Sequence, residues 1–107
     1  MPVNISSVGE VLTVYLEGEL DHHAAKTVRE EIDEAVEFNM PTLLILDFDR
    51  VTFMDSSGIG VIIGRYKKMN YVGGAVYVCG MNKNVDRIFQ MSGLYKLVKQ
   101  LNKAEVV

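Results

Sequence analysis

The chain has 107 residues, with 14 acidic and 11 basic side chains and a formal net charge of -3. This length fits one domain, covering residues 1–107, with one hydrophobic core. The acidic balance disfavours nucleic acid as the main partner, because phosphate binding needs a clustered excess of Lys and Arg. Cys79 is the only cysteine, so the fold does not rely on a disulfide. The sequence has no signal-peptide pattern and no apolar run of membrane-spanning length, so we expect a cytoplasmic protein.

The first forty residues predict two strands and a helix. Apolar and polar side chains alternate over residues 11–17, which is the period of a strand, and residues 3–5 are expected to form a short edge strand. Gly18 is expected to end the longer strand and to begin a loop. Apolar residues then recur at helical spacing over residues 22–38, and Asp21 is well placed as the N-cap of that helix.

The remaining residues continue the alternation of strands and helices. The apolar run at residues 42–48 has the length of a strand that is buried on both faces. A second helix follows Gly58, residues 75–79 form another buried strand, and residues 82–91 form a third helix. Residues 94–98 predict a last short strand, and residues 100–107 predict either one or two helical turns or a frayed tail.

The second helix has an apolar stripe and a charged face. The stripe that we expect to be buried consists of Ile59, Ile62, Ile63, Tyr66 and Met69. The face that we expect to be solvated carries Arg65, Lys67 and Lys68.

This order of elements predicts an α/β domain built from strand–helix–strand units with right-handed crossovers. Ligands and partners usually meet such folds at the C-terminal ends of the strands, where loops lead into helices. Two predicted loops lie at that edge, at residues 19–23 and 54–58. We therefore expect the functional site there.

The second of these loops contains Asp55-Ser56-Ser57-Gly58, directly before the second helix. A simple explanation is capping, because serine is a favoured N-cap residue. However, Gly58, Gly60 and Gly64 each cost up to about 1 kcal/mol of helix propensity relative to Ala. Glycines at this cost indicate close approach to the backbone, either by a packed neighbouring element or by a docking protein. The sequence leaves both explanations open.

A helix start also suits a phosphate group, because its free N–H groups and its positive dipole end stabilise negative charge. Phosphorylation of Ser56 would add about -1.5 to -2 charges without opposing the fold. If the surface around Ser56 is an interface, a like-charge clash of several kcal/mol would abolish binding.

Catalytic and metal sites are disfavoured by the spacing of the candidate residues. Neither serine follows the glycine that a nucleophile elbow requires, and the sequence lacks a phosphate-binding G-x-x-x-x-G-K-[ST] motif. His22 and His23 are neighbours, so on a helix they point in different directions and do not pair on one metal. A triad of Asp21, His23 and Ser56 lacks an evident oxyanion loop or substrate cleft. We expect no enzyme activity, no metal and no cofactor.

Three segments resemble the bacterial anti-sigma-factor antagonists, which are single STAS domains. FMDSSGIGVIIGRYK at residues 53–67 resembles the family signature, and MSGL at residues 91–94 is a further match. GELDHH at residues 18–23 resembles the loop of the sporulation branch, the antagonists of the anti-sigma F factor. The segments occur in the expected order and span nearly the whole chain.

The resemblance implies a mixed sheet of four to five strands with about four helices packed mainly on one side. It also implies that the unphosphorylated protein, a monomer when free, binds an anti-sigma factor that is a GHKL-type serine kinase and so frees the sigma factor. The kinase would supply the ATP and phosphorylate Ser56, a PP2C-type phosphatase would remove the phosphate, and Ser57 would have a structural role. The implied partner surface consists of Asp21, His22, His23, Asp55, Ser56, Ser57, Gly58, Ile59 and Gly60. The alternative is a STAS scaffold or ligand-sensing module in another signalling complex.

Overall fold

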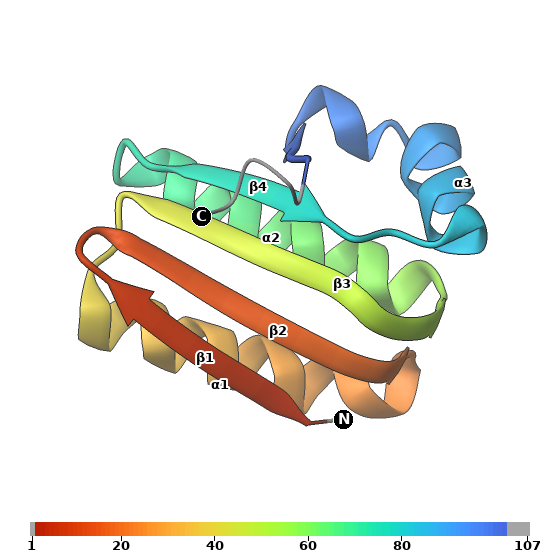
Figure 1. Cartoon of the computed structure of the whole chain (residues 1–107), viewed down its shortest axis with the longest axis horizontal. Helices are drawn as coiled ribbons and strands as arrows, with labels where there is room; N and C mark the ends of the chain where they lie inside the picture. Colours follow the sequence, from red (N-terminus) through yellow and green to blue (C-terminus); the bar gives the residue numbers. More distant parts are fainter. Residues whose placement is uncertain (1, 103–107) are drawn as a thin grey trace.

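The computed structural model describes residues 2–102 and alternates strands with helices along the chain (Figure 1). The strands are β1 (Val3–Val8), β2 (Val11–Leu20), β3 (Leu43–Met54), β4 (Ala75–Cys79) and β5 (Lys99–Gln100). The helices are α1 (His22–Asn39), α2 (Ser56–Tyr71) and α3 (Lys83–Ser92), followed by a short 3-10 helix, η1 (Leu94–Lys96).

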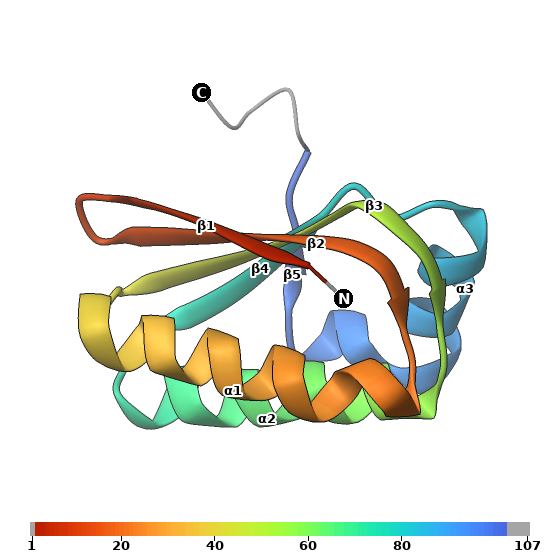
Figure 2. The ribbon, with the colours of Figure 1, turned by 90° about the horizontal axis from the view of Figure 1, so that it is seen from below.

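The five strands form one mixed sheet in the order β1-β2-β3-β4-β5. β1 is antiparallel to β2, and all other neighbouring strands are parallel. α1 and α2 cover one face of this sheet, as Figure 2 shows in a view along the layers. The predicted α/β class and one-sided packing are confirmed. In place of about four helices, the described residues form three α-helices and one 3-10 turn.

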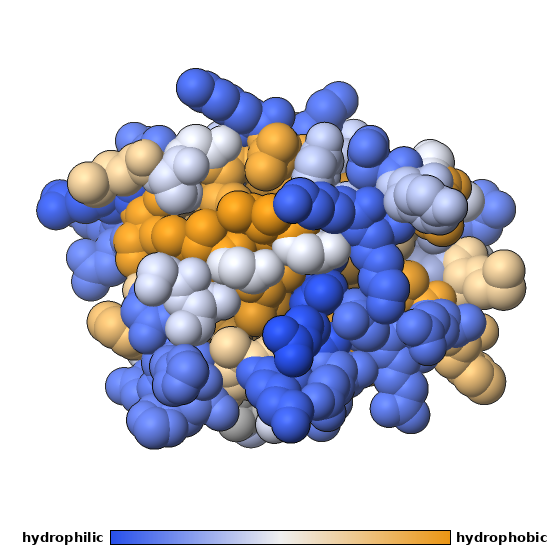
Figure 3. Space-filling model, turned by 180° about the vertical axis from the view of Figure 1, so that it is seen from behind, coloured by the Kyte–Doolittle hydropathy of each residue, from blue (hydrophilic) through white to orange (hydrophobic). Residues whose placement is uncertain are grey.

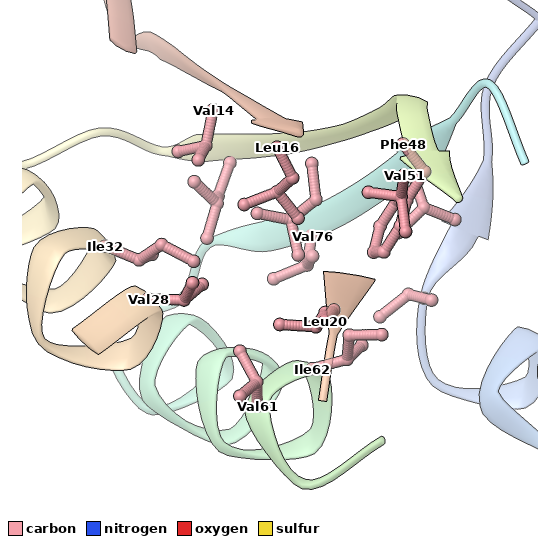
Figure 4. Packing of buried hydrophobic residues seen from close by; sticks show 14 of the residues in the cluster. Val14, Leu16, Leu20, Val28, Ile32, Phe48, Val51, Val61, Ile62 and Val76 are labelled. Atoms are coloured by element: carbon pink, nitrogen blue, oxygen red, sulfur yellow. The ribbon is translucent and has the colours of Figure 1, made fainter. Parts of the chain in front are cut away.

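The hydrophobic core lies between the sheet and the two long helices (Figure 4). Val14 and Leu16 belong to the face of β2 that carries its buried alternate residues, and they meet Ile32 of α1 and Ile62 of α2 from across the core. All four are at most 2% exposed. Burying one such side chain stabilises the fold by about 1.5–3 kcal/mol, so this layer fixes the position of both helices.

The expected end of β2 at Gly18 is wrong, because the strand continues to Leu20. Gly18 has a φ of 95° and lies at a point where the pairing register between β2 and β3 shifts. Gly18 pairs with Val51 just before the shift, and Leu20 pairs with Met54 beyond it. The strand expected at residues 42–48 extends to Met54, because the far half of β3 pairs with the end of β2.

The strand expected at residues 94–98 is also wrong. Gly93 adopts a left-handed conformation that ends α3, and the 3-10 helix η1 follows directly. The backbone N–H groups of Leu97 and Val98 both donate to the carbonyl of Leu94 at 2.9 Å, so this segment turns where a strand would extend. In this C-terminal segment the strand that pairs with β4 is Lys99–Gln100, and the prediction for the tail beyond residue 102 lies outside the described residues.

The buried face of α2 differs from the predicted stripe. Ile62 and Met69 are buried as expected, whereas the other three members of the stripe are only half-buried. The remaining buried positions of the helix are Gly58, Val61 and Arg65. Arg65, expected on the solvated face, instead forms an ion pair with Asp33 of α1. The buried face of α2 is rotated around the helix axis relative to the predicted stripe, because α2 packs against α1 as well as against the sheet. Among the described residues, no helix has the length and apolar character needed to cross a membrane.

Candidate functional site

The starts of α1 and α2 lie next to each other at one edge of the sheet. β2 ends at Leu20 and β3 ends at Met54, and these two residues are partners in the parallel register. The backbone N–H of Asp55 donates to the carbonyl of Leu20 at 3.4 Å, which links the two strand ends. Both strand-to-helix connections therefore lie at the same end of the molecule, at the right in Figure 2.

A single aspartate separates strand from helix in each connection. Asp21 lies between β2 and α1 with φ -111° and ψ -173°, and Asp55 lies between β3 and α2 with φ -113° and ψ -168°. These extended conformations are typical of N-cap residues. The two loops predicted at residues 19–23 and 54–58 are thus each reduced to one residue.

Asp21 caps α1 as the sequence predicts. Its Oδ1 accepts hydrogen bonds from the backbone N–H of His23 at 3.0 Å and of Ala24 at 3.1 Å. His22 and His23 follow in the first turn, and both are exposed, with ring centroids 5.9 Å apart. The cap holds the backbone in place and leaves both imidazole rings at the surface.

Asp55, and neither serine, is the N-cap of α2. Its Oδ1 accepts a hydrogen bond from the backbone N–H of Ser57 at 2.8 Å, and its carbonyl accepts from the N–H of Gly58 at 3.0 Å. The capping explanation for the serines is therefore wrong. Ser56 and Ser57 are the first two residues of the helix, and their hydroxyls are not needed to cap it.

Ser56 is exposed at the first position of α2, whereas Ser57 is half-buried. Within residues 2–102, the Ser56 hydroxyl forms no hydrogen bond and no contact with His23 that would support a triad. A substituent on this hydroxyl would extend into solvent beside the positive end of the α2 dipole. The position combines chemical access with an environment that favours negative charge.

The three glycines of α2 have different surroundings. A Cβ added to Gly58 would overlap Met54 Cγ and lie 3.1 Å from Leu20 Cγ, so this glycine allows α2 to pack closely on the ends of β2 and β3. A Cβ added to Gly60 or Gly64 would meet nothing within 4 Å. Packing therefore explains Gly58, but it does not explain the other two. Gly60 and Gly64 leave the surface of the helix flat.

Apolar side chains are also exposed or half-buried at this end of the molecule. Ile59 and Ile63 are half-buried against the core, and Phe53 at the end of β3 is 49% exposed. Figure 3 shows hydrophobic residues gathered over the N-terminal half of α2 on the helical side of the molecule. Sequence reasoning missed Phe53, although its place in the strand alternation opposite the buried Met54 would have indicated it.

Within residues 2–102, no three His, Cys, Asp or Glu side chains are grouped as metal ligands. The Oδ1 atoms of both aspartates accept backbone hydrogen bonds, and the exposed positions are a serine, two histidines and a glycine.

The family model of the STAS domain matches residues 3–105. An anti-sigma F factor antagonist of Paenibacillus polymyxa is 48% identical over 88 residues, which cover 82% of this chain and 75% of that protein. The structure of the anti-sigma factor antagonist SpoIIAA in its unphosphorylated form is 32% identical and has a TM-score of 0.83. The match covers 98% of this chain and 92% of that one.

The structure of the Bacillus cell fate determinant SpoIIAA in the phosphorylated form is also similar, at 32% identity and a TM-score of 0.75. That match covers 98% of this chain and 96% of the other. The similarity to these proteins thus spans both the sheet and the two helix starts that form the candidate site. The chain belongs to the anti-sigma-factor antagonist family of STAS-domain proteins.

Proposed function

We propose that this protein antagonises an anti-sigma factor by partner switching, with Ser56 as the switch. In the unphosphorylated form it binds an anti-sigma factor that is also a GHKL-type serine kinase, and the sigma factor is released to transcribe genes of sporulation. Phosphorylation of Ser56 by that kinase blocks binding, and a PP2C-type phosphatase restores it. The protein itself is a cytoplasmic monomer when free and acts by binding, without catalysis.

The observation that supports this proposal most strongly is the position of Ser56. Its hydroxyl is exposed at the first residue of α2, and Asp55 already performs the capping that a serine would otherwise provide. A phosphate there is favoured by the positive end of the helix dipole. The domain therefore tolerates a charge of about -1.5 to -2 that a docked protein would not.

The surface beside Ser56 has the properties of a docking site. It is flat at Gly60, apolar at Ile59 and Ile63, and half-buried or exposed at these positions. A partner that buries this surface would bring its own groups within contact distance of residue 56. A like-charge clash at such a contact costs several kcal/mol, and each 1.4 kcal/mol changes the affinity about tenfold.

The proposed partner surface includes residues with distinct roles. Asp21 and Asp55 shape the backbone, Ser57 and Gly58 support the first turn, and four residues supply direct contacts. Those contact residues are His22, His23, Ile59 and Gly60. The relatives support phosphorylation as the switch, because SpoIIAA, with which this chain shares its fold, has been solved in both a phosphorylated and an unphosphorylated form.

The experiment uses the anti-sigma kinase encoded in the same genome, with Mg-ATP. We expect one phosphate per chain, located on Ser56 by mass spectrometry of proteolytic fragments. Ser56→Ala should accept no phosphate and still bind the kinase, whereas Ser57→Ala should be phosphorylated normally. Ser56→Asp should keep its circular dichroism spectrum and lose kinase binding. A phosphate found on Ser57, or tight binding by Ser56→Asp, would contradict the proposal.

A further inference from the structure

The outer edge of β1 is open to another strand. Within residues 2–102, β1 pairs with β2 on one side only, and its register runs without interruption from Val3 to Val8. Natural sheets usually protect an edge with a charged residue, a proline or a bulge. The sequence of β1, VNISSV, contains none of these. Every second residue of such an edge directs its backbone N–H and C=O away from the sheet.

A groove with a volume of about 400 Å³ runs between this edge and the C-terminal half of α1. Figures 1 and 2 both show β1 as the outer strand with α1 alongside it. Val3 and Ile5 line the groove from β1, and Ala35 and Phe38 line it from α1. Ile5 is 44% exposed and Phe38 is 84% exposed, so the groove offers apolar surface to a partner.

The rim of the groove is acidic. Glu31 and Glu34 line it together with Ala35 and Phe38, at the spacing of one helix face. Both glutamates are exposed, and within residues 2–102 neither forms an ion pair. The acids on the other side of α1, Asp33 and Glu37, are paired with cations of α2. The groove therefore carries two exposed negative charges that form no ion pair with the described residues.

We propose that the β1 edge and this groove bind an extended, basic segment of a partner protein. The segment adds to the sheet as a sixth strand through backbone hydrogen bonds, and every second side chain enters the groove. Apolar side chains at these positions contact Ile5 and Phe38, and Lys or Arg side chains pair with Glu31 and Glu34. Binding in this groove does not depend on the phosphorylation of Ser56, because the groove lies away from the helix starts where Ser56 is located.

The acidic rim of the groove also disfavours a second copy of the chain as its occupant. If β1 paired antiparallel with β1 of another copy, both α1 helices would lie on the same face of the joined sheet. Glu31 and Glu34 of one copy would then face the same two glutamates of the other copy. Like charges at an interface oppose association. A basic segment removes this repulsion.

The test uses a synthetic peptide, Lys-Ser-Val-Thr-Lys-Ser-Val, in which lysine and valine occupy alternate groove positions, and a matched peptide with Glu in place of Lys. Fluorescence anisotropy should detect binding of the lysine peptide and at least tenfold weaker binding of the glutamate peptide. The double variant Glu31→Lys/Glu34→Lys and the single variant Phe38→Ser should each weaken binding of the lysine peptide at least tenfold. Glu19→Lys, at an exposed acid of β2 that does not line the groove, and Tyr71→Ser, an equally exposed aromatic site on α2, are the controls and should bind normally.

Amide hydrogen exchange of the unmodified protein provides a second measurement that needs no variant. The lysine peptide should protect alternate amides of β1 that exchange freely without it. Equal binding of the two peptides, or normal binding by Glu31→Lys/Glu34→Lys, would overturn the proposal. So would unchanged exchange in β1, or protection of β1 that rises with protein concentration in the absence of peptide, which would identify a second copy as the occupant.

Discussion

Arg65 of α2 and Asp33 of α1 form an ion pair across the contact between the two helices. The distance from Arg65 Nε to Asp33 Oδ1 is 2.8 Å, and the Arg65 side chain is only 8% exposed. Burial lowers the pKa of the Arg65 guanidinium, and the neighbouring Asp33 carboxylate opposes this shift. The buried cation therefore depends on Asp33 for its compensation, and the pair fixes α2 relative to α1.

Asp33→Asn should destabilise the protein by about 3 kcal/mol, because it leaves a buried cation without its counter-ion. The free energy of unfolding in urea is the measurement. Glu37→Gln is the matched control, since Glu37 pairs with Lys68 on the same helix contact but its side chain is 71% exposed. An exposed pair contributes at most about 1 kcal/mol. Equal losses in the two variants would show that the burial of Arg65 has no energetic consequence.

Gly58→Ala and Gly60→Ala should change stability in opposite directions. The Cβ added at residue 58 would overlap Met54 in the core, and overpacking of this kind costs about 1–3 kcal/mol. The Cβ added at residue 60 meets nothing within 4 Å, so the variant gains helix propensity of up to about 1 kcal/mol. Thermal unfolding followed by circular dichroism distinguishes the two. A destabilised Gly60→Ala would show that the residue has a packing role after all.

Gly60→Ala also tests the docking surface. If the anti-sigma kinase lies flat on α2, a methyl group at residue 60 should weaken its binding at least tenfold while the protein becomes more stable. Calorimetric titration of the kinase with the variant measures this effect. Gly64→Ala, one turn farther from Ser56, is the matched control on the same helix and should weaken binding less. Unchanged affinity in Gly60→Ala would exclude this part of α2 from the interface.

Local patterns were sufficient to predict most of the fold. The helical spacing of Val28 and Ile32 identified α1, and the alternation of Leu12, Val14 and Leu16 identified β2. The end of β2 was not predictable, because residues 18–20 remain in the strand only through pairing with the far half of β3. Such a contact joins residues that lie more than thirty positions apart, and no local pattern reveals it.

The site was predictable in its location and less so in its details. The order of the elements indicated that the connections after β2 and β3 share one edge, and Asp21 was recognisable as a cap. Asp55 was not, because Asp and Ser are almost equally good N-cap residues and only the backbone conformation distinguishes them. Arg65 was expected in solvent, since an arginine is rarely buried unless another helix supplies a carboxylate.

Phosphorylation of Ser56 should leave the domain as stable as before or stabilise it by about 0.3–1 kcal/mol at low ionic strength. The physical reason is the position of the phosphate at the N-terminus of α2, where the dipole favours negative charge. Urea unfolding of the phosphorylated and unphosphorylated proteins is the measurement, and the difference should shrink when salt screens the charge. A large loss of stability on phosphorylation would mean that partner release follows from unfolding and not from a blocked surface.

The hydroxyl of Tyr95 donates to Asp86 Oδ1 at 2.5 Å beside α3, and this contact should make stability sensitive to alkaline pH. Burial raises the pKa of Tyr95 above its ordinary value, and the hydrogen bond to Asp86 raises it further. A raised pKa means that the folded state prefers the neutral phenol. The contribution of the Tyr95 phenol to the free energy of unfolding is therefore complete below the unfolded-state pKa of about 10. This contribution is lost progressively as the pH rises above that value.

Tyr95→Phe removes the donor and should cost about 1 kcal/mol at neutral pH. The stability gap between Tyr95→Phe and the unmodified protein should narrow steadily above about pH 10, because the Tyr95 phenol then ionises in the unfolded state while the folded state still holds it neutral. Urea unfolding between pH 7 and pH 11 measures the gap, and the other tyrosines and the lysines affect both proteins alike. A gap that stays constant over this range would show that the Tyr95 phenol titrates equally in the folded and unfolded states, and would remove Asp86 as the cause of the shift.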